Sequence, residues 1–394
     1  GAACQTCTTR CPQALDVAGI MEFLSREARA RGLKPRVPEV EIFNQAFMRE
    51  VRLWRRAYEL GLMAEMKLRT GDLTGDLDLG LKMILKQKLA FLPTPVRPPR
   101  RPKPIAGAAG AIAYYPGCSL HSTAREFDTS TRAVCAALGL KLHELNNWVC
   151  CGSSAAHRAD PEAALRLPVQ NLTLVEQGGF REVVMPCAAC FNRHKAAQHA
   201  LRQGDHPAPA GAETHPEAVQ VSSLSEAILR HVGAPQVAAR TKRPLAGLRA
   251  VCYYGCLLTR PAHVTGAPRP ENPAEIDALM QAIGLEGVDW SYKTVCCGAA
   301  HSLTRPDIVL KLSGELIRQA QAAGADLIAV ACPLCHTNLD ARQFQMKLGA
   351  SLPVLYFTQL MAVAFGLPEQ AALHKNLVDP RPLLKARGLL ELYP

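Results

Sequence analysis

The sequence contains no long hydrophobic run. None of its 394 residues fall in a stretch of about 18 or more uninterrupted apolar side chains, which excludes a membrane-spanning helix. The glycine-rich fingerprint of a dinucleotide-binding turn is absent too, so a flavin, if one is required, is expected on another protein. No secretory signal peptide is recognised, and because Gly1 stands where a start methionine would, we expect the gene product to begin upstream.

The composition is that of an ordinary globular chain. Hydrophobic residues make up 48% and charged residues 20%, which excludes a disordered, collagenous or fibrous protein, and the length predicts two or three domains. The net charge of +11 has no basic patch interleaved with aromatics beside it, so we expect no nucleic-acid partner. Fifteen unevenly spread cysteines are too sparse for a small disulfide-stapled secreted domain.

Proline divides the chain. Residues 93 to 104 read PTPVRPPRRPKP, and proline fixes the backbone and removes donors, so residues 93 to 110 are predicted to be an extended, semi-rigid linker. Before it, residues 1 to 92 are predicted to be all helical. Asp16 is expected to cap one helix, and apolar residues at helical spacing from Phe43 to Leu62 predict one longer helix.

After the linker, short apolar strands alternate with helices, a pattern typical of parallel α/β units. The strands are predicted at 111 to 115, 183 to 185, 250 to 254 and 327 to 331, and apolar stripes predict helices around 276 to 283 and 308 to 316. The region also repeats itself, because YYPGC is answered by YYGC, and CCG and CxxC recur at offsets of 146 and 145 residues. We therefore expect two similar lobes, residues 111 to 240 and 241 to 394, with a surface loop at 204 to 218.

Each lobe carries five cysteines in one arrangement. The adjacent pair follows the first cysteine after 31 residues in one lobe and 39 in the other, and CxxC follows after 35 and 34. Small buried core cysteines predict neither adjacent pairs nor a repeated CxxC, so we interpret both sets as metal ligands. The first set is Cys118, Cys150, Cys151, Cys187 and Cys190, and the second set is Cys256, Cys296, Cys297, Cys332 and Cys335.

Thiolate ligands select zinc, copper(I) or iron-sulfur clusters. Zinc takes four ligands in a tetrahedron, so five cysteines leave one in excess, and adjacent cysteines suit different irons of one cluster better than a single ion. Iron-sulfur is therefore favoured, and a structural zinc protein is the alternative. Each CxxC is expected between a strand and a helix, where N–H groups at the helix N-terminus favour thiolate.

The two C…CCG…CxxC sets, with YYPGCSLHSTAREFDTSTRAVC and YYGCLLTRP around their first cysteines, resemble the CCG domains of the heterodisulfide reductase B subunit over residues 111 to 365. The resemblance implies two tandem duplicated Rossmann-like α/β lobes preceded by an all-α ferredoxin-type domain. It also implies one noncubane [4Fe-4S] cluster on each set of five cysteines. In this scheme each cluster takes one sulfur of a disulfide, and the disulfide is reduced to two thiols at the interface between the lobes.

The N-terminal motif Cys4-x2-Cys7-x3-Cys11-Pro12 fits the last three cysteines of a ferredoxin run. With LRTGDLTGDLDLGLKMILKQKL it resembles the second half of the heterodisulfide reductase C subunit, which implies one or two cubane [4Fe-4S] clusters. Gly1 stands where the first cysteine of the run belongs, so the ligand set is incomplete in this chain. We favour an N-terminally incomplete product over completion by a partner protein or a non-cysteine ligand.

Cys135 and Cys252 have no counterpart in the repeat and are expected in the core. Four histidines follow cluster cysteines closely. His157 and His301 are candidate proton donors to a departing thiolate, because imidazole titrates near neutral pH, and hydrogen-bonded structural histidines are the equally weighted alternative. The other two are His121 and His336.

The leading hypothesis is the catalytic iron-sulfur subunit of a cytoplasmic heterodisulfide reductase-like complex, acting on a disulfide such as CoM-S-S-CoB. The resemblance implies, as partners, a flavin-containing subunit like the A subunit of heterodisulfide reductase and other electron-transfer subunits. The alternative is an electron relay in a flavin-dependent dehydrogenase of the glycolate or lactate oxidase or anaerobic glycerol-3-phosphate dehydrogenase type. Two intact sets of five cysteines favour disulfide chemistry, and loss of one would favour the relay.

Overall fold

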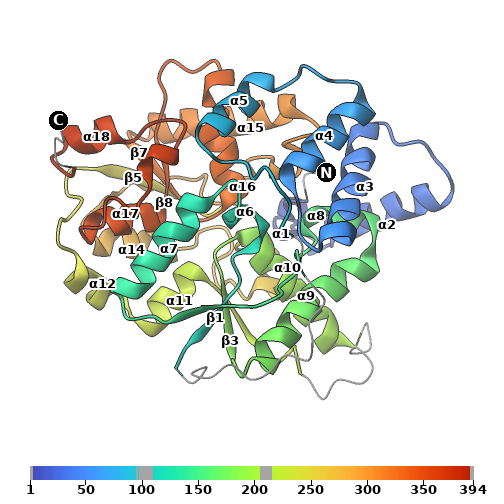
Figure 1. Ribbon diagram of the computed structural model, residues 1–394, viewed down its shortest axis with the longest axis horizontal. Coiled ribbons are helices and arrows are strands. Elements are labelled where there is room, and N and C mark those ends of the chain that lie inside the picture. The colour runs from blue at the N-terminus through green and yellow to red at the C-terminus, as the bar shows by residue number, and fades with distance from the viewer. Residues whose placement is uncertain (1–2, 95, 97–109, 205–214, 391–394) are drawn as a thin grey trace.

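The computed structural model describes residues 3–94, 96, 110–204 and 215–390. Two parallel four-stranded sheets flanked by helices follow a group of N-terminal helices (Figure 1). The prediction of α/β lobes behind a helical region is confirmed. Of the expected linker only residues 93, 94, 96 and 110 are described, and most of the expected loop at 204 to 218 also lies outside the described residues.

The N-terminal region contains five described helices. Asp16 caps α2 as expected, because its carboxylate accepts a hydrogen bond from the Gly19 N–H. The single long helix expected from Phe43 to Leu62 is wrong. Arg55 adopts a left-handed conformation (φ 63°) and ends the first part, and a second helix starts at Glu59. The helices are α1 (Thr6–Thr9), α2 (Val17–Ala30), α3 (Pro38–Trp54), α4 (Glu59–Thr70) and α5 (Leu77–Leu85).

The first lobe is a parallel sheet in the order β2-β1-β3-β4. Its strands are β1 (Ile112–Tyr114), β2 (Leu142–Glu144), β3 (Glu182–Met185) and β4 (Gln220–Ser223). Two of them, β1 and β3, coincide with predicted strands to within one residue at each end, and β2 and β4 were not predicted. The helices are α6 (Gly117–Leu120), α7 (Arg125–Ala137), α8 (Ser153–Ala159), α9 (Pro161–Gln177), α10 (Ala188–Gln203), α11 (Leu224–His231) and α12 (Ala234–Arg240).

The second lobe repeats this topology in the order β6-β5-β7-β8. Its strands are β5 (Arg249–Tyr253), β6 (Glu286–Gly287), β7 (Leu327–Val330) and β8 (Val354–Tyr356), and its longer helices are α14 (Glu275–Ala282), α15 (Pro306–Ala322) and α17 (Phe357–Ala364). Shorter helical turns are α13 (Ala262–Thr265), η1 (Ala299–His301), α16 (Pro333–His336), η2 (Thr337–Ala341), η3 (Gln343–Gln345), η4 (Leu373–Lys375) and α18 (Arg381–Ala386). The same strand order in both sheets supports the inferred duplication.

One predicted helix face is shifted in the second lobe. In α14 the predicted stripe is buried as expected. In α15 the predicted residue Leu316 is buried as expected, but Ile308 and Leu312 are only half-buried. The core face of this helix also contains Val309, Ile317 and Ala320, so it is rotated slightly from the predicted stripe.

The two lobes pack directly on each other through α7 and α17. Phe127 stacks on Tyr356 with ring centroids 4.1 Å apart, and Ser130 Oγ lies 2.7 Å from Thr358 Oγ1. A continuous hydrophobic core includes strands of both sheets. The two lobes therefore share one core across their interface.

The N-terminal helices lie across both lobes, as the blue segment in Figure 1 shows. Residues of α3 and α4 share a hydrophobic cluster with α8 and α9 of the first lobe. On the second lobe, Arg342 makes a two-pronged ion pair with Asp76 (2.8 and 3.1 Å) at the start of α5. Arg10 also forms an ion pair with the second lobe, through Glu271 at 2.6 Å.

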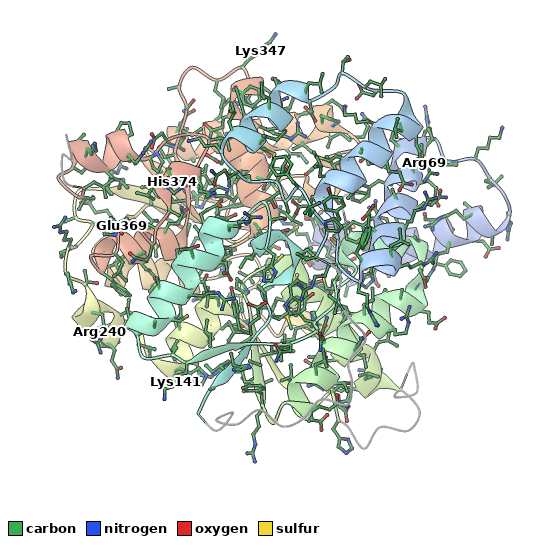
Figure 2. All side chains as sticks on the ribbon, viewed as in Figure 1. Arg69, Lys141, Arg240, Lys347, Glu369 and His374 are labelled. Carbon is green, nitrogen blue, oxygen red and sulfur yellow. The ribbon has the colours of Figure 1, made fainter. Side chains whose placement is uncertain are left out.

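Charged side chains point outward over all parts of the surface, including Arg69, Lys141 and Lys347 (Figure 2). Across the described residues, no helix combines the length and apolar character that a membrane crossing requires.

Candidate metal centres

The first set of cysteines comes together at the carboxyl ends of β1 and β3. The Cys150 thiol contacts both Cys118 and Cys151, and Cys151 Sγ lies 3.5 Å from Cys190 Sγ. Cys187, immediately before α10, contacts Cys190. All five predicted residues of this set are therefore neighbours in one chain of sulfur atoms.

The second set repeats all of these contacts except the one between the two adjacent cysteines. Cys297 Sγ lies 3.5 Å from Cys335 Sγ, Cys332 contacts Cys335, and Cys296 contacts Cys256. In both lobes the glycine of CCG donates its N–H to the first sulfur of the adjacent pair: Gly152 to Cys150 at 3.4 Å and Gly298 to Cys296 at 3.2 Å.

A glycine is required beside each first cysteine. Gly117 has φ +74° and Gly255 has φ +71°, a region that L side chains rarely adopt. A Cβ on Gly117 would lie 2.9 Å from Cys190 Sγ, and one on Gly255 would lie 2.9 Å from Cys335 Sγ. The last sulfur of each CxxC therefore packs against a glycine that has no side chain.

One tyrosine of each lobe supports the adjacent cysteine pair. Tyr115 donates its hydroxyl to the Val149 carbonyl (2.7 Å), and Tyr253 donates to the Val295 carbonyl (2.6 Å). Both carbonyls precede the adjacent cysteines directly. The hydrogen bonds therefore fix the loop that carries Cys150 in one lobe and its counterpart in the other.

The two sets meet at Cys187 and Cys332, the first cysteines of the two CxxC motifs. Their thiols interact across the lobe interface, and both residues are buried. The two cysteines hold equivalent positions, since each stands two residues after the end of its strand, β3 or β7.

Each set includes one cysteine whose thiol pKa is lowered, which favours the thiolate form. Hydrogen bonds from the Cys150 and Cys190 thiols hold the pKa of Cys151 well below its ordinary value. A hydrogen bond from Cys335 likewise lowers the pKa of Cys297, the matching residue. Because the thiolate is the form that binds metal, Cys151 and Cys297 are favoured as ligands.

The N-terminal motif is only partly assembled. Cys4 contacts Cys296 of the second set, and this contact together with burial raises the pKa of Cys4. Cys7 is exposed and Cys11 is half-buried, and neither hydrogen-bonds to another cysteine in the described part of the chain. Cys4 therefore places the N-terminal motif beside the second lobe, a contact that the sequence pattern did not predict.

The segment that joins α3 and α4 contacts the first set of cysteines. The Ala57 N–H donates to Cys118 Sγ at 3.3 Å, and the Arg55 carbonyl accepts from the Cys150 N–H at 2.8 Å. An unbroken helix would use these backbone groups internally. The helix end that the sequence pattern missed therefore supplies a backbone donor to a sulfur.

The two candidate proton donors lie near the sets without hydrogen-bonding to a described cysteine. His157 is half-buried, its buried Nε2 has no partner among the described residues, and desolvation holds its pKa well below the usual range. His301 Nδ1 lies 3.4 Å from Thr304 Oγ1, and burial lowers its pKa. Both imidazoles are therefore neutral at pH 7.

The other two histidines make structural contacts. His121 Nε2 lies 3.0 Å from Glu144 Oε1. His336 Nε2 lies 3.0 Å from the Val354 carbonyl oxygen, and its ring stacks on Tyr356. The two cysteines expected in the core, Cys135 and Cys252, are each 1% exposed and sit in the shared hydrophobic core, as predicted.

Sequence reasoning missed three polar residues beside the sets. Arg193 and Asn338 are each the third residue after the last cysteine of a CxxC, and both are buried. Arg56 lies in the break that contacts the first set, with its guanidinium carbon 3.6 Å from the Trp148 ring centroid. The equal spacing of Arg193 and Asn338 was the available signal.

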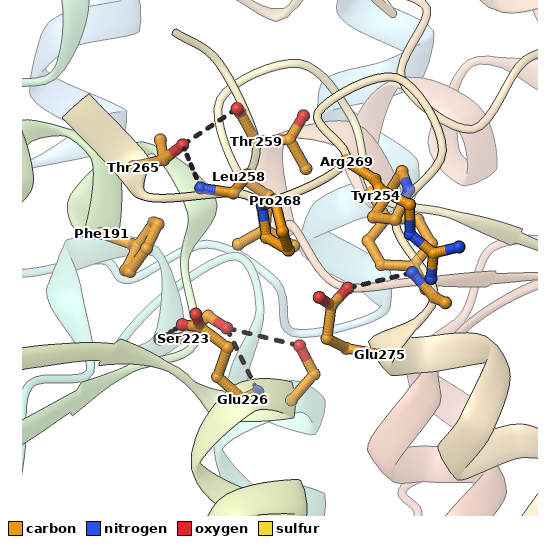
Figure 3. Close-up of a pocket in the computed structure, with 14 residues that line it drawn as sticks. Phe191, Ser223, Glu226, Tyr254, Leu258, Thr259, Thr265, Pro268, Arg269 and Glu275 are labelled. Atoms are coloured by element: carbon orange, nitrogen blue, oxygen red, sulfur yellow. Dashed lines mark hydrogen bonds between the residues drawn. The ribbon is translucent and has the colours of Figure 1, made fainter. Parts of the chain in front are cut away.

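A cavity opens between the lobes, bounded by Phe191 and the turn from Ser223 to Glu226 on one side and by the segment from Tyr254 to Glu275 on the other (Figure 3). The Thr265 hydroxyl donates to the Thr259 carbonyl in its wall. Its lining includes none of the predicted site cysteines or histidines. The cavity therefore neighbours the cysteine sets without containing them.

The donor sets fit the group that the sequence implies. Among the described residues, no three His, Cys, Asp or Glu side chains are arranged around the position of one metal ion. The sulfurs instead extend in a row of five in the first lobe and in a contacting pair beside a contacting trio in the second, with a backbone N–H on the first of each adjacent pair. A row of soft thiol donors suits a cluster of several irons.

Two matched α/β lobes with matched thiol sets define a tandem cysteine-rich protein. Residues 112–193 and 250–340 match the family described as CCG, the cysteine-rich domain. The chain belongs to the family of the heterodisulfide reductase B subunit, and this membership gives it an iron-sulfur redox role.

Three relatives each match about two thirds of this chain. The membrane anchor subunit of the 8-methylmenaquinol:fumarate reductase of Wolinella succinogenes is 30% identical over 69% of this chain and 98% of its own length. The B subunit of the ferredoxin/F(420)H(2)-dependent CoB-CoM heterodisulfide reductase of Methanosarcina acetivorans is 24% identical over 68% and 94%. The B subunit of the ferredoxin:CoB-CoM heterodisulfide reductase of Methanosarcina mazei is 25% identical over 68% and 94%.

A solved structure shares the fold. The crystal structure of a hypothetical protein from Helicobacter pylori superposes with a TM-score of 0.56 at 12% identity, covering 81% of this chain and 60% of that one.

Proposed function

We propose that the chain is the iron-sulfur catalytic subunit of a cytoplasmic heterodisulfide reductase-like complex, which reduces a low-molecular-weight disulfide to two thiols. The observation that carries the proposal is the contact between Cys187 and Cys332, which joins two complete sets of five cysteines across the lobe interface. The division at residues 92, 110 and 240 into a ferredoxin-type domain, a linker and two CCG domains belongs to the same proposal.

Two adjacent one-electron sites suit a disulfide. A disulfide takes up two electrons, and a noncubane [4Fe-4S] cluster in each lobe would supply them one at a time. The first lobe would hold its cluster through Cys118, Cys150, Cys151, Cys187 and Cys190, and the second through Cys256, Cys296, Cys297, Cys332 and Cys335. Because both sets are complete, this arrangement favours disulfide chemistry over a simple relay.

The residues of the chain prepare these sites before any substrate arrives. The glycines at 117 and 255 leave room for a sulfur, and the tyrosine hydroxyls on the Val149 and Val295 carbonyls hold the loops of the adjacent cysteines. His157 and His301 are the proposed sources of protons for the product thiols. Their lowered pKa values mean that each would have to gain its proton from solvent or a neighbour during turnover.

The N-terminal region is the proposed entry for electrons. Cys4, Cys7 and Cys11 would hold part of a cubane cluster, and the contact of Cys4 with Cys296 puts this motif against the second set. The proposed donors are a flavin-containing partner resembling the A subunit of heterodisulfide reductase and further electron-transfer subunits.

A second candidate function is an electron relay in a multi-subunit dehydrogenase or reductase with a flavin partner. It is favoured by the 30% identity to one component of the 8-methylmenaquinol:fumarate reductase over 98% of that protein's length. In that case the two sets would pass electrons between partners, and no disulfide would react.

The deciding experiment combines iron analysis with an activity assay. Protein purified without oxygen is expected to contain at least about eight irons per chain from the two five-cysteine sets, at four per cluster. Dithionite-reduced protein is then assayed against a panel of low-molecular-weight disulfides by counting released thiols.

Release of two thiols per disulfide, lost in a Cys187→Ala variant, supports the reductase. Full iron content without reaction of any disulfide, but with reoxidation by quinone analogues or flavin acceptors, supports the relay. Only about four irons per chain would contradict two clusters of the proposed kind.

A further inference from the structure

The two sets each offer five cysteine ligands in the same arrangement, but the charged residues around them differ. The duplication allows the lobes to be compared position by position. Beside the sulfurs, one buried position differs in charge and one backbone site differs in how its arginine is neutralised, and both differences point the same way.

The first difference follows each CxxC. Arg193 is the third residue after Cys190, and the matching residue after Cys335 is Asn338. Arg193 is 5% exposed, its Nε has no partner, and within the described ranges it forms no ion pair. Among the ionisable groups around it, its charge interacts most strongly with Cys151, then with the Glu22 carboxylate, and more weakly with Cys256.

Asn338 is neutral. Its amide donates to the Cys297 carbonyl at 3.4 Å and approaches Cys297 Sγ at 3.7 Å. The second lobe therefore has a neutral hydrogen-bond donor where the first lobe has a buried cation.

The second difference precedes each adjacent cysteine pair. Arg56 Nε donates to the Trp148 carbonyl (3.3 Å), and Arg260 Nη1 donates to the Thr294 carbonyl (2.9 Å), which is the matching position. Both guanidinium groups therefore lie on equivalent backbone oxygens, two residues before the cysteines.

Their charges are balanced differently. Arg260 is bound by the Glu271 carboxylate at 2.6 and 2.7 Å, and Glu271 also pairs with the half-exposed Arg10. Arg56 forms no ion pair in the part of the chain that the structure describes, and its charge acts on Cys118. Glu144, a carboxylate that also acts on Arg56, is occupied by Arg132.

We propose that Arg56 and Arg193 make a cluster on the first set easier to reduce than a cluster on the second set, so that the first lobe is the electron-accepting end of the pair. A reduced cluster carries one more negative charge, and nearby arginines that are not held in an ion pair stabilise that charge. One electron leaves the second site, which is oxidised by one, and reaches the first, which is reduced by one, with no bond made or broken.

This inference rests on the proposed occupancy of both sets by clusters and not on disulfide chemistry. It predicts the direction of electron transfer between the two clusters. An electron that enters beside Cys4 and Cys296 reaches the second set first and moves on to the first set, down the potential difference that the two arginines create.

The test is a redox titration of the full chain followed by electron paramagnetic resonance, in protein purified without oxygen. The wild type is expected to show two separate reduction steps for the five-cysteine sites. A Cys118→Ser variant assigns them, because the higher-potential step is the one expected to disappear or change.

Arg193→Gln and Arg56→Gln are each expected to lower the equilibrium constant of the higher step by about tenfold, which is about 59 mV for one electron. The lower step is expected to move much less. Arg193→Lys keeps the charge and is expected to stay near the wild type, which separates charge from packing. Iron content, measured on every variant, confirms that both sites are filled.

Equal shifts of both steps, no shift in either glutamine variant, or loss of the lower step in Cys118→Ser would overturn the inference. Iron for only one filled set would remove the premise shared with the proposed function. Protein that shows the selective shift but reduces no disulfide would support this inference while contradicting the reductase.

Discussion

Single glycines decide whether five sulfurs can converge. Gly117 and Gly255 occupy the same position in the two lobes, both at positive φ, and both lie against the last sulfur of CxxC. The backbone there turns in a conformation that L side chains rarely adopt, and a methyl group would also collide with a ligand. The repeated Gly-Cys pairs in the sequence pointed to these residues, but the partner sulfur was visible only in the fold.

We predict that Gly117→Ala removes the cluster of the first lobe. The added Cβ would lie 2.9 Å from Cys190 Sγ, so either the sulfur or the loop must move. Iron content is expected to fall by about four per chain, measured on protein purified without oxygen. Gly139→Ala is the matched control, because Gly139 has φ +76° but nothing within 4 Å of the added atom. If both variants lost the same amount of iron, backbone strain alone would explain the effect, and the contact with Cys190 would not be its cause.

Glu59 makes stability depend on pH. Its buried Oε2 has no hydrogen-bond partner, and burial raises its pKa from 4.5 to about 7. Because the folded pKa is the higher one, the stabilising contribution is complete below pH 4.5 and is lost as the pH rises through 7.

Glu59→Gln is therefore predicted to match the wild type near a pH of about 5 and to be more stable at about pH 8.5 by up to about 3 kcal/mol. Thermal unfolding at the two pH values measures the difference. Glu369→Gln, at an exposed position, is expected to change neither value. A gain that is the same at both pH values would contradict the assignment.

At the scale of helices and strands, the sequence predicted the alternation of strands and helices in both lobes and four of the eight strands. Apolar runs located β1, β3, β5 and β7, and the repeat of CCG and CxxC identified both cysteine sets. The short strands β2, β4 and β6 lack long apolar runs and were missed. Strand β8 was missed although it has such a run, which continues directly into α17. The break between α3 and α4 was also missed, because helical spacing continues across it. What ends α3 is docking on the first set, which a local pattern does not contain.

The attachment of α5 to the second lobe is predicted to depend on Asp76. Arg342 is 2% exposed and has its guanidinium on the Asp76 carboxylate, so Asp76→Ala would leave a buried cation without its counter-charge. We expect a loss of about 3 kcal/mol in the free energy of unfolding, measured by denaturant titration. Asp78→Ala, in the first turn of the same helix and without an ion pair among the described residues, is expected to cost less than about 1 kcal/mol. Equal losses would show that the ion pair does not hold α5.

At the scale of the whole molecule, the relative position of the lobes determines whether the two sets act together. The stack of Phe127 on Tyr356 and the contact of Ser130 with Thr358 hold α7 against α17, and the lobes also meet where Cys187 contacts Cys332. The proposed two-electron reaction requires that spacing, although each set is complete within its own lobe.

Phe127→Ala is predicted to lower disulfide reduction by about tenfold or more while leaving iron content unchanged. It removes a fully buried ring from the interface, at a cost of about 3 to 5 kcal/mol in stability. Phe180→Ala is the matched control, since Phe180 is buried within the first lobe beside His143. We expect a similar stability loss there with activity largely retained, as measured by thiol release from dithionite-reduced protein. Parallel activity losses would mean that stability alone limits the reaction.

The N-terminal helices are part of the same polypeptide as the lobes and contact both of them through Asp76, Arg10 and the break at Ala57. Their association is therefore intramolecular, at an effective concentration set by the chain rather than by the solution. Diluting the protein separates subunits that bind one another from different chains, but it does not loosen this contact. Any electron transfer between Cys4 and the second set would keep the same rate per molecule at nanomolar and micromolar protein concentrations.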